Sequence, residues 1–417
     1  MRGDPLTQTE PERALSLTHV PIFFSFFTWG FGTGAQHLVR PLFAYALTEN
    51  VFLVAVVIAM NAIPRIFTAP VTGYLTDRIG RKPLALFGAA LRGVTNVGQF
   101  MSGDFATFLA LEFIGQIGVS MWNTSSNVLL SDVTQTTNRG RVLALRQMST
   151  RMGFVAGPLI GGLVAAAFGL QSVFLVNGVS KVVIVLVVLF MVSETRPERV
   201  TGESATPVPQ KGDGRAAVLA VMRTRSFAAL AITLVGFSMA QTAILQALLP
   251  IYASTKLGAD ESSVGALVSV AAVVAFLLAY PNGIVSDRFG RKVSMVPGLL
   301  LLSAASTLLT ISDTYMLVLI AVAIQGSGEG LAMGTAHTYA MDLAPKDHRG
   351  AFLGVTMMFQ AVGAFAGPMF IGALYHGFSP AFAFATLAAW LAVASLAMGL
   401  FAKETAGPRA IDRASTQ

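Results

Sequence analysis

Long apolar runs, interrupted only by short polar breaks, constrain this chain more than any other feature of its sequence. A helix of about 20 apolar residues can cross the hydrocarbon core of a bilayer, and the chain contains twelve such runs. It is 54% hydrophobic and only 12% charged over 417 residues, whereas a soluble domain carries about 25% charged residues. Most of its surface must therefore face lipid, which excludes a water-soluble enzyme, a disordered chain or a fibrous protein.

The apolar runs form two sets of six around one polar linker. The first set covers residues 19–45, 51–74, 83–103, 105–131, 140–168 and 170–193. The second set covers residues 226–253, 261–284, 293–312, 314–341, 350–375 and 379–402. We expect an all-α membrane protein with an N-terminal half at 19–193, a cytoplasmic linker at 194–225, a C-terminal half at 226–402, and cytoplasmic tails at 1–18 and 403–417. The linker is rich in proline, glycine and charge, which is typical of a flexible connector.

The formal net charge of +7 suggests nucleic-acid binding until the basic residues are placed. They lie in the tails, the linker and the loops after spans 2, 4, 8 and 10, whereas the loops on the other side hold only Lys256. The positive-inside rule then puts both termini and the linker in the cytoplasm, in a multi-pass protein of the cell (inner or plasma) membrane. Because the basic residues are spread over short loops, no nucleic-acid partner is expected.

The sequence contains an internal repeat. Residues 73–82 recur as residues 283–292, which defines an offset of 210. Four further pairs share this offset: Asp132 and Asp342, Arg139 and Arg349, Gly153 and Gly363, and Glu194 and Glu404. Upstream of span 2 the offset slips by one, because Pro41 faces Pro250. The chain is therefore a tandem duplication of a six-span unit, a plan that many transporters share.

The repeated loop G-x-(L/V)-x-D-R-x-G-R-K resembles the signature between helices 2 and 3 of the major facilitator superfamily. The resemblance implies a secondary transporter with alternating access, built from two pseudo-symmetric six-helix halves. It also implies that the matching Asp and Arg residues form a charge network between the halves that holds the cytoplasmic gate closed; the alternative is only a well-anchored turn. The motif and gate residues so assigned are Gly73, Asp77, Arg78, Gly80, Arg81, Lys82, Asp132 and Arg139, and their second copies Gly283, Asp287, Arg288, Gly290, Arg291, Lys292, Asp342 and Arg349.

A glycine-rich motif lies in span 5, at Gly153, Gly157, Pro158, Gly161 and Gly162. Glycines four residues apart share one helix face and let another backbone pack closely. The proline cannot donate a backbone hydrogen bond, so the helix can bend there. The motif resembles one typical of the drug–proton antiporter branch of the superfamily, which favours export; the alternative is ordinary packing of small residues.

Charged residues inside the membrane are costly and usually functional. A desolvated carboxylate can change its protonation state near the working pH, so the candidates for proton coupling are Glu112 in span 4, Glu329 in span 10 and, third, His37 in span 1. The alternative for Glu112 is a buried ion pair with an arginine such as Arg65 or Arg151. Span 1 lacks the acid that many drug antiporters carry there.

Polar residues on shared faces of spans 1, 2 and 4 predict a hydrated path through the first half, and polar and methionine residues of the second half predict a wall that adapts to varied apolar ligands. For each residue, packing or contact with lipid is the alternative. The candidates for the substrate cavity are Gln36, Arg40, Asn61, Arg65, Gln116, Asn123, Asn127, Arg151, Gln241, Gln246, Met357 and Gln360.

Together these observations predict a proton-driven exporter of small apolar or cationic compounds, with the substrate, protons and the lipid bilayer as its partners. We expect a monomer and no enzyme activity. Cysteine is absent, and no P-loop lysine motif or H-E-x-x-H sequence occurs, so neither a cofactor nor a metal is expected. A carrier of organic anions or metabolites is the alternative, since arginines are abundant in the first half. A membrane-embedded enzyme or non-transporting sensor lacks a catalytic constellation and would leave the duplicated gate unexplained.

Overall fold

The computed structural model describes residues 19–134, 139–194, 214–345 and 348–406, apart from some side chains within the helices. Every regular element in these ranges is helical. The first half contains α1 (His19–Thr48), α2 (Val51–Ala59), α3 (Ile63–Ile79), α4 (Arg81–Met101), α5 (Phe105–Asp132), α6 (Arg139–Phe168) and α7 (Ser172–Met191). The second contains α9 (Arg225–Met239), the π-helix η1 (Ala240–Leu248), α10 (Leu249–Leu257), α11 (Glu261–Phe289), α12 (Arg291–Thr310), α13 (Tyr315–Leu343), α14 (Arg349–Gly377) and α15 (Pro380–Phe401).

These helices form the twelve expected spans, with α2 and α3 making one span and α9, η1 and α10 another. Two details differ from expectation. Span 2 is not one continuous helix but breaks at residues 60–62, just before Pro64, whose ring has no amide to donate to the preceding turn. The last part of the expected linker is helical, because α8 (Gly214–Met222) precedes the seventh span.

Nine helical segments among the described residues are long and apolar enough to cross a membrane on their own. The spans that miss this standard are α1, the α2–α3 pair and α4. The helices α2 and α3 are only 9 and 17 residues long, so each is too short to cross on its own. In α1 and α4, polar side chains such as Gln36, Arg40, Arg92 and Gln99 lower the mean hydropathy, and these side chains are buried within the first half. Such helices can cross a bilayer because their polar groups face protein instead of lipid.

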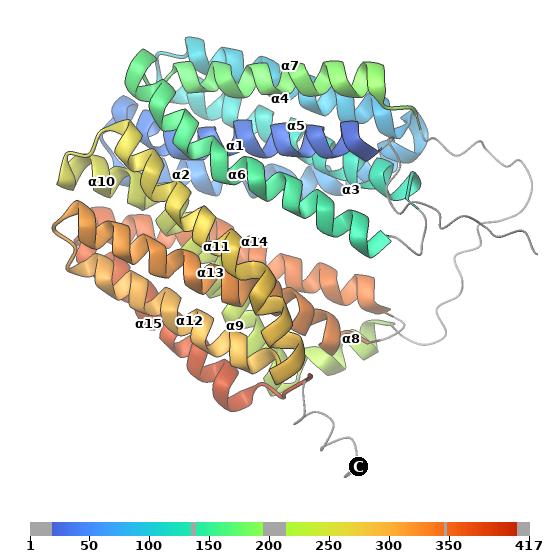
Figure 1. Ribbon diagram of the computed structural model, residues 1–417, viewed down its shortest axis with the longest axis vertical. Coiled ribbons are helices and arrows are strands. Elements are labelled where there is room, and N and C mark those ends of the chain that lie inside the picture. The colour runs from blue at the N-terminus through green and yellow to red at the C-terminus, as the bar shows by residue number, and fades with distance from the viewer. Residues whose placement is uncertain (1–18, 135–138, 195–213, 346–347, 407–417) are drawn as a thin grey trace, which may run out of the picture.

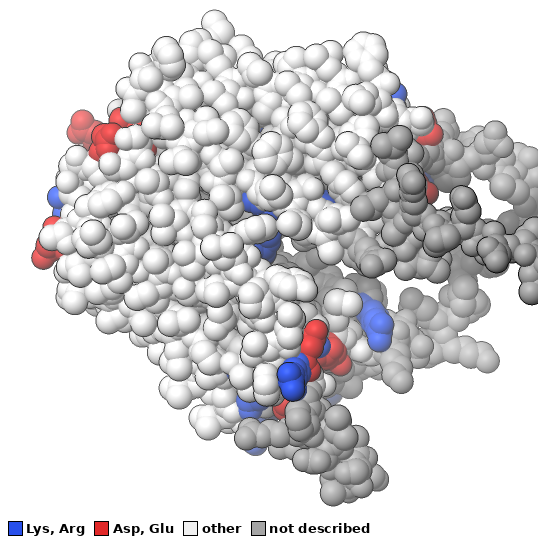
Figure 2. Space-filling view, in the orientation of Figure 1, with Lys and Arg blue, Asp and Glu red and all other residues white. Residues whose placement is uncertain are grey.

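The two halves lie side by side, with α1–α7 in the upper part of Figure 1 and α9–α15 in the lower part. We call the end of the bundle near α8, to the right in Figure 1, the linker end, and the end near α10 the opposite end. On the face shown in Figure 2, most charged side chains lie near these two ends, and the surface between them is uncharged apart from basic side chains in the hollow between the halves. A surface of this kind suits a protein belted by lipid.

The halves contact each other through two glycines related by the repeat. A Cβ on Gly162 of α6 would lie 2.6 Å from the carbonyl oxygen of Glu261 at the start of α11. A Cβ on Gly372 of α14 would lie 2.5 Å from the Cβ of Ala55 in α2. Both separations are too short for real side chains, so only glycine permits these contacts. Both lie toward the opposite end of the bundle.

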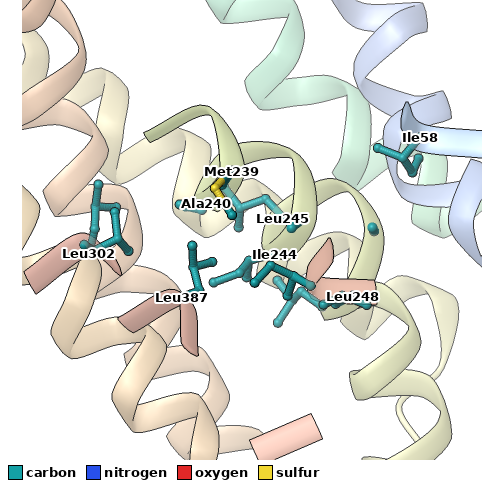
Figure 3. Packing of buried hydrophobic residues seen from close by; sticks show 14 of the residues in the cluster. Ile58, Met239, Ala240, Ile244, Leu245, Leu248, Leu302 and Leu387 are labelled. Atoms are coloured by element: carbon teal, nitrogen blue, oxygen red, sulfur yellow. The ribbon is translucent and has the colours of Figure 1, made fainter. Parts of the chain in front are cut away.

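A continuous apolar cluster supports this closed end. It joins α1 and α2 to the second half, and it includes Ile58, Ile244, Leu248 and Leu387. Figure 3 shows Met239, Ile244 and Leu248 along the seventh span, with Leu387 beside them and Ile58 of α2 farther across. Apolar packing therefore seals the opposite end, and any opening between the halves must lie toward the linker end.

The glycine contact predicts a conformational variant. Gly162→Leu places side-chain atoms against the backbone of α11, so it should separate the halves at the opposite end. The chain has no cysteine, so spin labels on cysteines introduced at Gln171 and Phe378 report the distance across that end. We expect a longer distance in Gly162→Leu. Gly334→Leu is the matched control, because no atom lies within 4 Å of a Cβ there. An unchanged distance in Gly162→Leu would contradict the proposed role of the contact.

Candidate functional site

A cavity of about 310 Å³ lies between the two halves. The first half contributes α1 and α6 to its walls, and the second contributes η1, α11 and α13. Figure 2 shows the surface hollowed between the halves, with basic side chains visible in the hollow. Six of the predicted site residues line the cavity: His37, Arg151, Pro158, Gln241, Gln246 and Glu329. A volume of this size falls within the range of small-molecule sites.

The walls combine apolar and uncharged polar groups. Apolar contact comes from Phe154, Val155, Leu245, Phe276 and Met333. The uncharged polar groups are the side-chain amides of Gln147, Gln241 and Gln246 and the hydroxyl of Thr150. The newly named lining residues, which belong to α6, η1, α11 and α13, were not predicted, since nothing in their sequence separates them from packing residues.

The π-helix η1 places both predicted glutamines, Gln241 and Gln246, in the cavity wall. They are five residues apart, which matches the i to i+5 spacing of a π-helix and brings both to one face. Segments of π-helix are frequent at functional sites. The sequence predicted an ordinary helix here, in which residues five apart point about 140° away from each other. The π-helix explains how both glutamines can line the same wall.

Opposite charges line the cavity from opposite halves. Arg151 of α6 donates through Nη2 to Sδ of Met333 at 3.2 Å, and a thioether is a weak acceptor. Glu329 lies four residues before Met333, one turn away on the same face of α13. Its carboxylate has no hydrogen-bond partner among the described residues, and Arg151 is the cation that acts on it electrostatically. The ring centroid of His37 lies 5.3 Å from that of Phe154.

Glu112 occupies a different place, inside the first half, and is fully buried. Its Oε1 lies 3.2 Å from Nε of Arg40, and its Oε2 lies 3.1 Å from Nη2 of Arg92. Gln99 and Gln116 also donate to the carboxylate, at 2.8 and 2.7 Å. An ion pair was one of two predicted roles for this residue, and the described partners are Arg40 and Arg92. Of the two suggested partners, Arg151 lines the cavity instead, and the side chain of Arg65 lies outside the described part of the structure.

The predicted cavity residues Gln36, Asn61 and Gln116 belong to this network and do not line the cavity. Arg92 donates to Oε1 of Gln36 at 2.8 Å, and Nε2 of Gln36 donates to Gln99 at 3.0 Å. Asn61, at the break between α2 and α3, accepts from Arg40 at 3.2 Å and also from Gln116. We call this set of buried side chains the Glu112 network. It ties together four of the six spans of the first half.

The Glu112 network predicts a stability effect. Glu112→Gln removes the only carboxylate that faces two buried guanidinium groups in the described network, and leaving such charges unpaired costs about 3–5 kcal/mol. We expect a clearly lower melting temperature for purified Glu112→Gln, and less monodisperse protein on size-exclusion chromatography. Asp313→Asn is the control, since Asp313 forms an exposed ion pair with Lys256. A melting temperature equal to that of wild type would show that the network does not support the fold.

The duplicated loops form two matching charge clusters at the linker end. Nε of Arg81 donates to Asp132 at 3.0 Å, and Nε of Arg291 donates to Asp342 at 3.0 Å. Arg291 also pairs with Asp287. The predicted network joins the two halves, but each of these bonds lies within one half. In this structure the clusters therefore fasten each loop to its own half. The side chains of Asp77 and Arg139, and Gly73, lie outside the described residues.

The turns themselves agree with the expected glycines. Gly80 and Gly290 have φ of 117° and 112°, a region that side chains rarely adopt. Gly283, in contrast, has open space where a Cβ would lie, so close helix approach does not explain it. Arg78 and Arg288 lie over the rings of Tyr74 and Phe289, at 4.7 and 5.6 Å. Arg349 begins α14 and is exposed.

Two further acids, Glu194 and Glu404, complete these clusters. The carboxylate of Glu194 accepts from the backbone N–H groups of Arg81 and Lys82 at 3.0 and 3.2 Å. Glu404 does the same for Arg291 and Lys292 at 2.7 and 3.1 Å. Each acid thus caps the N-terminus of the helix that follows the loop, where a negative charge is favoured. The shared offset of 210 marked this pair in the sequence, although it did not reveal the role.

The two caps predict matched losses of stability. Glu194→Ala and Glu404→Ala should each lower the melting temperature of the purified protein by roughly 2–4 °C, because two backbone donors lose their acceptor. Glu194→Gln and Glu404→Gln, which keep an acceptor oxygen, should lose less. A melting temperature that does not respond to either alanine would exclude a stabilising role for the caps.

The span 5 motif packs against α1. A Cβ on Gly153 or Gly157 would collide with backbone atoms of Phe27 or Phe31, and one on Gly161 would lie 2.9 Å from Cα of Ala35. Pro158 lies within the helix, next to the cavity. Gly162 instead faces the second half. One motif therefore fixes α6 to its own half and to the other.

The remaining candidates lie away from the cavity. Asn123 and Asn127 are half-buried in α5, and neither lines it. Met357 is 64% exposed. Gln360 lies 3.2 Å from a ring nitrogen of His337. The arginine Arg40, as described above, serves the Glu112 network.

Comparison with known proteins identifies the family to which the whole chain is similar. A family model described as Major Facilitator Superfamily matches residues 22–256 and 230–417. A curated relative, "Multidrug resistance protein MdtL" of Escherichia coli O157:H7, is 24% identical over 270 residues, covering 64% of this chain and 66% of the relative. The match therefore spans slightly less than two thirds of that protein.

Solved structures share the fold at low identity. A POT family transporter in complex with a thioalcohol-conjugated peptide has a TM-score of 0.74 at 14% identity, covering 92% of this chain and 95% of the other. A D-xylose–proton symporter has a TM-score of 0.73 at 16% identity, covering 93% and 98%. A bacterial homologue of the lysosomal transporter Spinster, inward-facing and unoccupied, has a TM-score of 0.73 at 14% identity, covering 94% and 96%.

Proposed function

This chain belongs to the major facilitator superfamily, and we propose that it is a proton-coupled exporter of small apolar or cationic compounds. It is a multi-pass membrane transporter, not an enzyme. The observation that carries the proposal is Glu329, a carboxylate in the wall of a cavity between the halves with no hydrogen-bond partner among the described residues. Similarity to a multidrug resistance protein supports the same reading.

The cavity walls suit such compounds. Phe154, Phe276 and Met333 offer flat and adaptable apolar contact. The glutamine amides can donate or accept hydrogen bonds without demanding one ligand geometry. Glu329 attracts a cation when it is ionised. A cavity of about 310 Å³ limits the cargo to small molecules.

Glu329 is also the residue that we propose carries the proton. Glu112 is enclosed by two arginines and two glutamines, whereas Glu329 lines the space that substrate and water enter. In the ionised form, Glu329 attracts both a cationic substrate and Arg151 on the facing wall. Protonation removes that attraction. A proton and a cationic substrate thus compete for one carboxylate, which is the requirement for exchange between them.

The orientation follows from the charge distribution of the loops. We propose that the linker end is cytoplasmic, so that both termini and the linker lie on the cytoplasmic side of the cell membrane. The cavity lies on the linker-end side of the Gly162 and Gly372 contacts, and the opposite end is sealed by apolar packing. The two halves, at 19–193 and 226–402, then rock about the cavity to expose it to either side.

Flux in proteoliposomes tests the function. The purified protein is reconstituted, a pH gradient is imposed, and transport of the cationic dye ethidium is followed by fluorescence. We expect wild type to move dye in proportion to the gradient. Glu329→Gln, which cannot ionise, should lose gradient-driven transport while remaining folded. Dye movement that ignores the gradient would contradict proton coupling.

Matched variants separate the roles of the two charges. Glu329→Asp retains a titratable group and should keep part of the activity, whereas Asp313→Asn at the opposite end should transport like wild type. Gradient-driven transport in Glu329→Gln equal to that of wild type would exclude Glu329 as the proton carrier and favour Glu112. Transport of an organic anion such as p-aminohippurate, lost in Arg151→Gln, together with no dye transport, would replace the exporter proposal with an anion carrier.

A further inference from the structure

A second hollow lies outside the transport cavity, on the outer surface between α9 and α15. Its volume is about 610 Å³, and its lining is almost wholly apolar. Its lining includes Ala228 and Ala229 of α9 and Ala397, Leu400 and Phe401 of α15. Arg225, the first residue of α9, borders it at that end. The hollow is therefore an apolar groove with a cation at its mouth.

The first half of the protein carries larger side chains at two corresponding positions. With the offset of 209 that applies before span 2, His19 and Phe23 of α1 match Ala228 and Ile232 of α9. The two rings in α1 stack with centroids 6.1 Å apart. The first copy thus carries a ring at both positions, whereas the second carries the methyl group of Ala228 and the aliphatic side chain of Ile232.

Arg225 lies at the mouth of the groove, and two further basic residues are each two positions away from a lining residue. Arg223, Arg225 and Lys403 are exposed, and none of them forms an ion pair with a described residue. The backbone N–H of Lys403 donates to Oγ of Ser226 at 3.0 Å, which holds the end of α15 beside the start of α9. The start of α9 also carries the positive end of its helix dipole. The mouth is therefore suited to a phosphate group.

The groove has a definite far end. Nε1 of Trp390 donates to the carbonyl oxygen of Ile232 at 3.3 Å and bridges α15 to α9. From Arg225 to Ile232 the helix rises about 10 Å, at 1.5 Å per residue. This length accommodates the part of an acyl chain nearest the headgroup, while the rest of the chain continues along the apolar surface.

We propose that this groove binds one anionic phospholipid, with an acyl chain between α9 and α15 and the phosphate at Arg223, Arg225 and Lys403. An apolar groove that ends in basic residues at the membrane surface matches both parts of such a lipid. A zwitterionic lipid fits the groove equally well but gains less at its mouth. The proposal is independent of the substrate and of proton coupling.

Native mass spectrometry of the full chain tests the proposal. The detergent-purified protein is titrated with palmitoyl-oleoyl phosphatidylglycerol or with the phosphatidylcholine that has the same chains. We expect one phosphatidylglycerol to be retained more strongly than phosphatidylcholine. Arg225→Gln should weaken retention of phosphatidylglycerol about fivefold, the effect of losing one basic residue near a phosphate.

A second variant tests the groove itself. Ala228→Phe places a ring in the groove and should abolish the first binding event for both lipids. Val182→Phe adds the same side chain to an exposed position of α7 and should bind like wild type. Equal melting temperatures of the two phenylalanine variants confirm that both are folded. Equal retention of the two lipids by wild type, or unchanged phosphatidylglycerol binding in both Arg225→Gln and Ala228→Phe, would overturn the proposal.

Discussion

A charged group in hydrocarbon is costly, and this cost organises the whole molecule. The chain has few charges, and the structure assigns the described ones to distinct surroundings. Arg81 and Arg291 pair with aspartates at the linker end. Arg40 and Arg92 enclose Glu112 in the first half. Arg151 and Glu329 line the cavity between the halves. Each placement keeps the charge away from lipid, by ion pairing, by burial in protein or by access to water.

The duplication gave the two halves the same helices but different interiors. Both halves retain the loop clusters, their capping acids and the glycine contacts of spans 5 and 11. The first half then encloses the Glu112 network, and Lys181 lies over the ring of Trp29 at 4.1 Å. At the centre of the second half, apolar residues such as Ile244, Leu302 and Leu387 pack together. A half held by many hydrogen bonds and ion pairs is suited to a rigid wall, whereas the π-helix of the other half offers a wall that can repack.

The sequence predicts what periodicity and repetition encode. Apolar runs define the twelve spans, and the offset of 210 defines the two halves and the paired loops. The partners of Glu112 depend instead on how α1, α4 and α5 are rotated about their axes, and helix rotation is set by packing between spans. The sequence places Arg40, Arg65, Arg92 and Arg151 all at membrane depth, so it could not choose among them. The π-helix could not be predicted either, because the sequence of Ala240–Leu248 is also that of an ordinary apolar α-helix.

The same limit explains why only some predicted cavity residues line the cavity. Gln36 and His37 are adjacent in α1, yet one joins the Glu112 network and the other faces the cavity. Neighbours on a helix point about 100° apart, so one helix can serve both sites only if it stands between them. In that position α1 packs on α6 through Gly153 and Gly157. Any movement of α6 that brings Arg151 toward Glu329 must therefore carry α1 and the buried network with it. Under the proposal that Glu329 carries the proton, rigid coupling of this kind transmits the change at that carboxylate to an entire half.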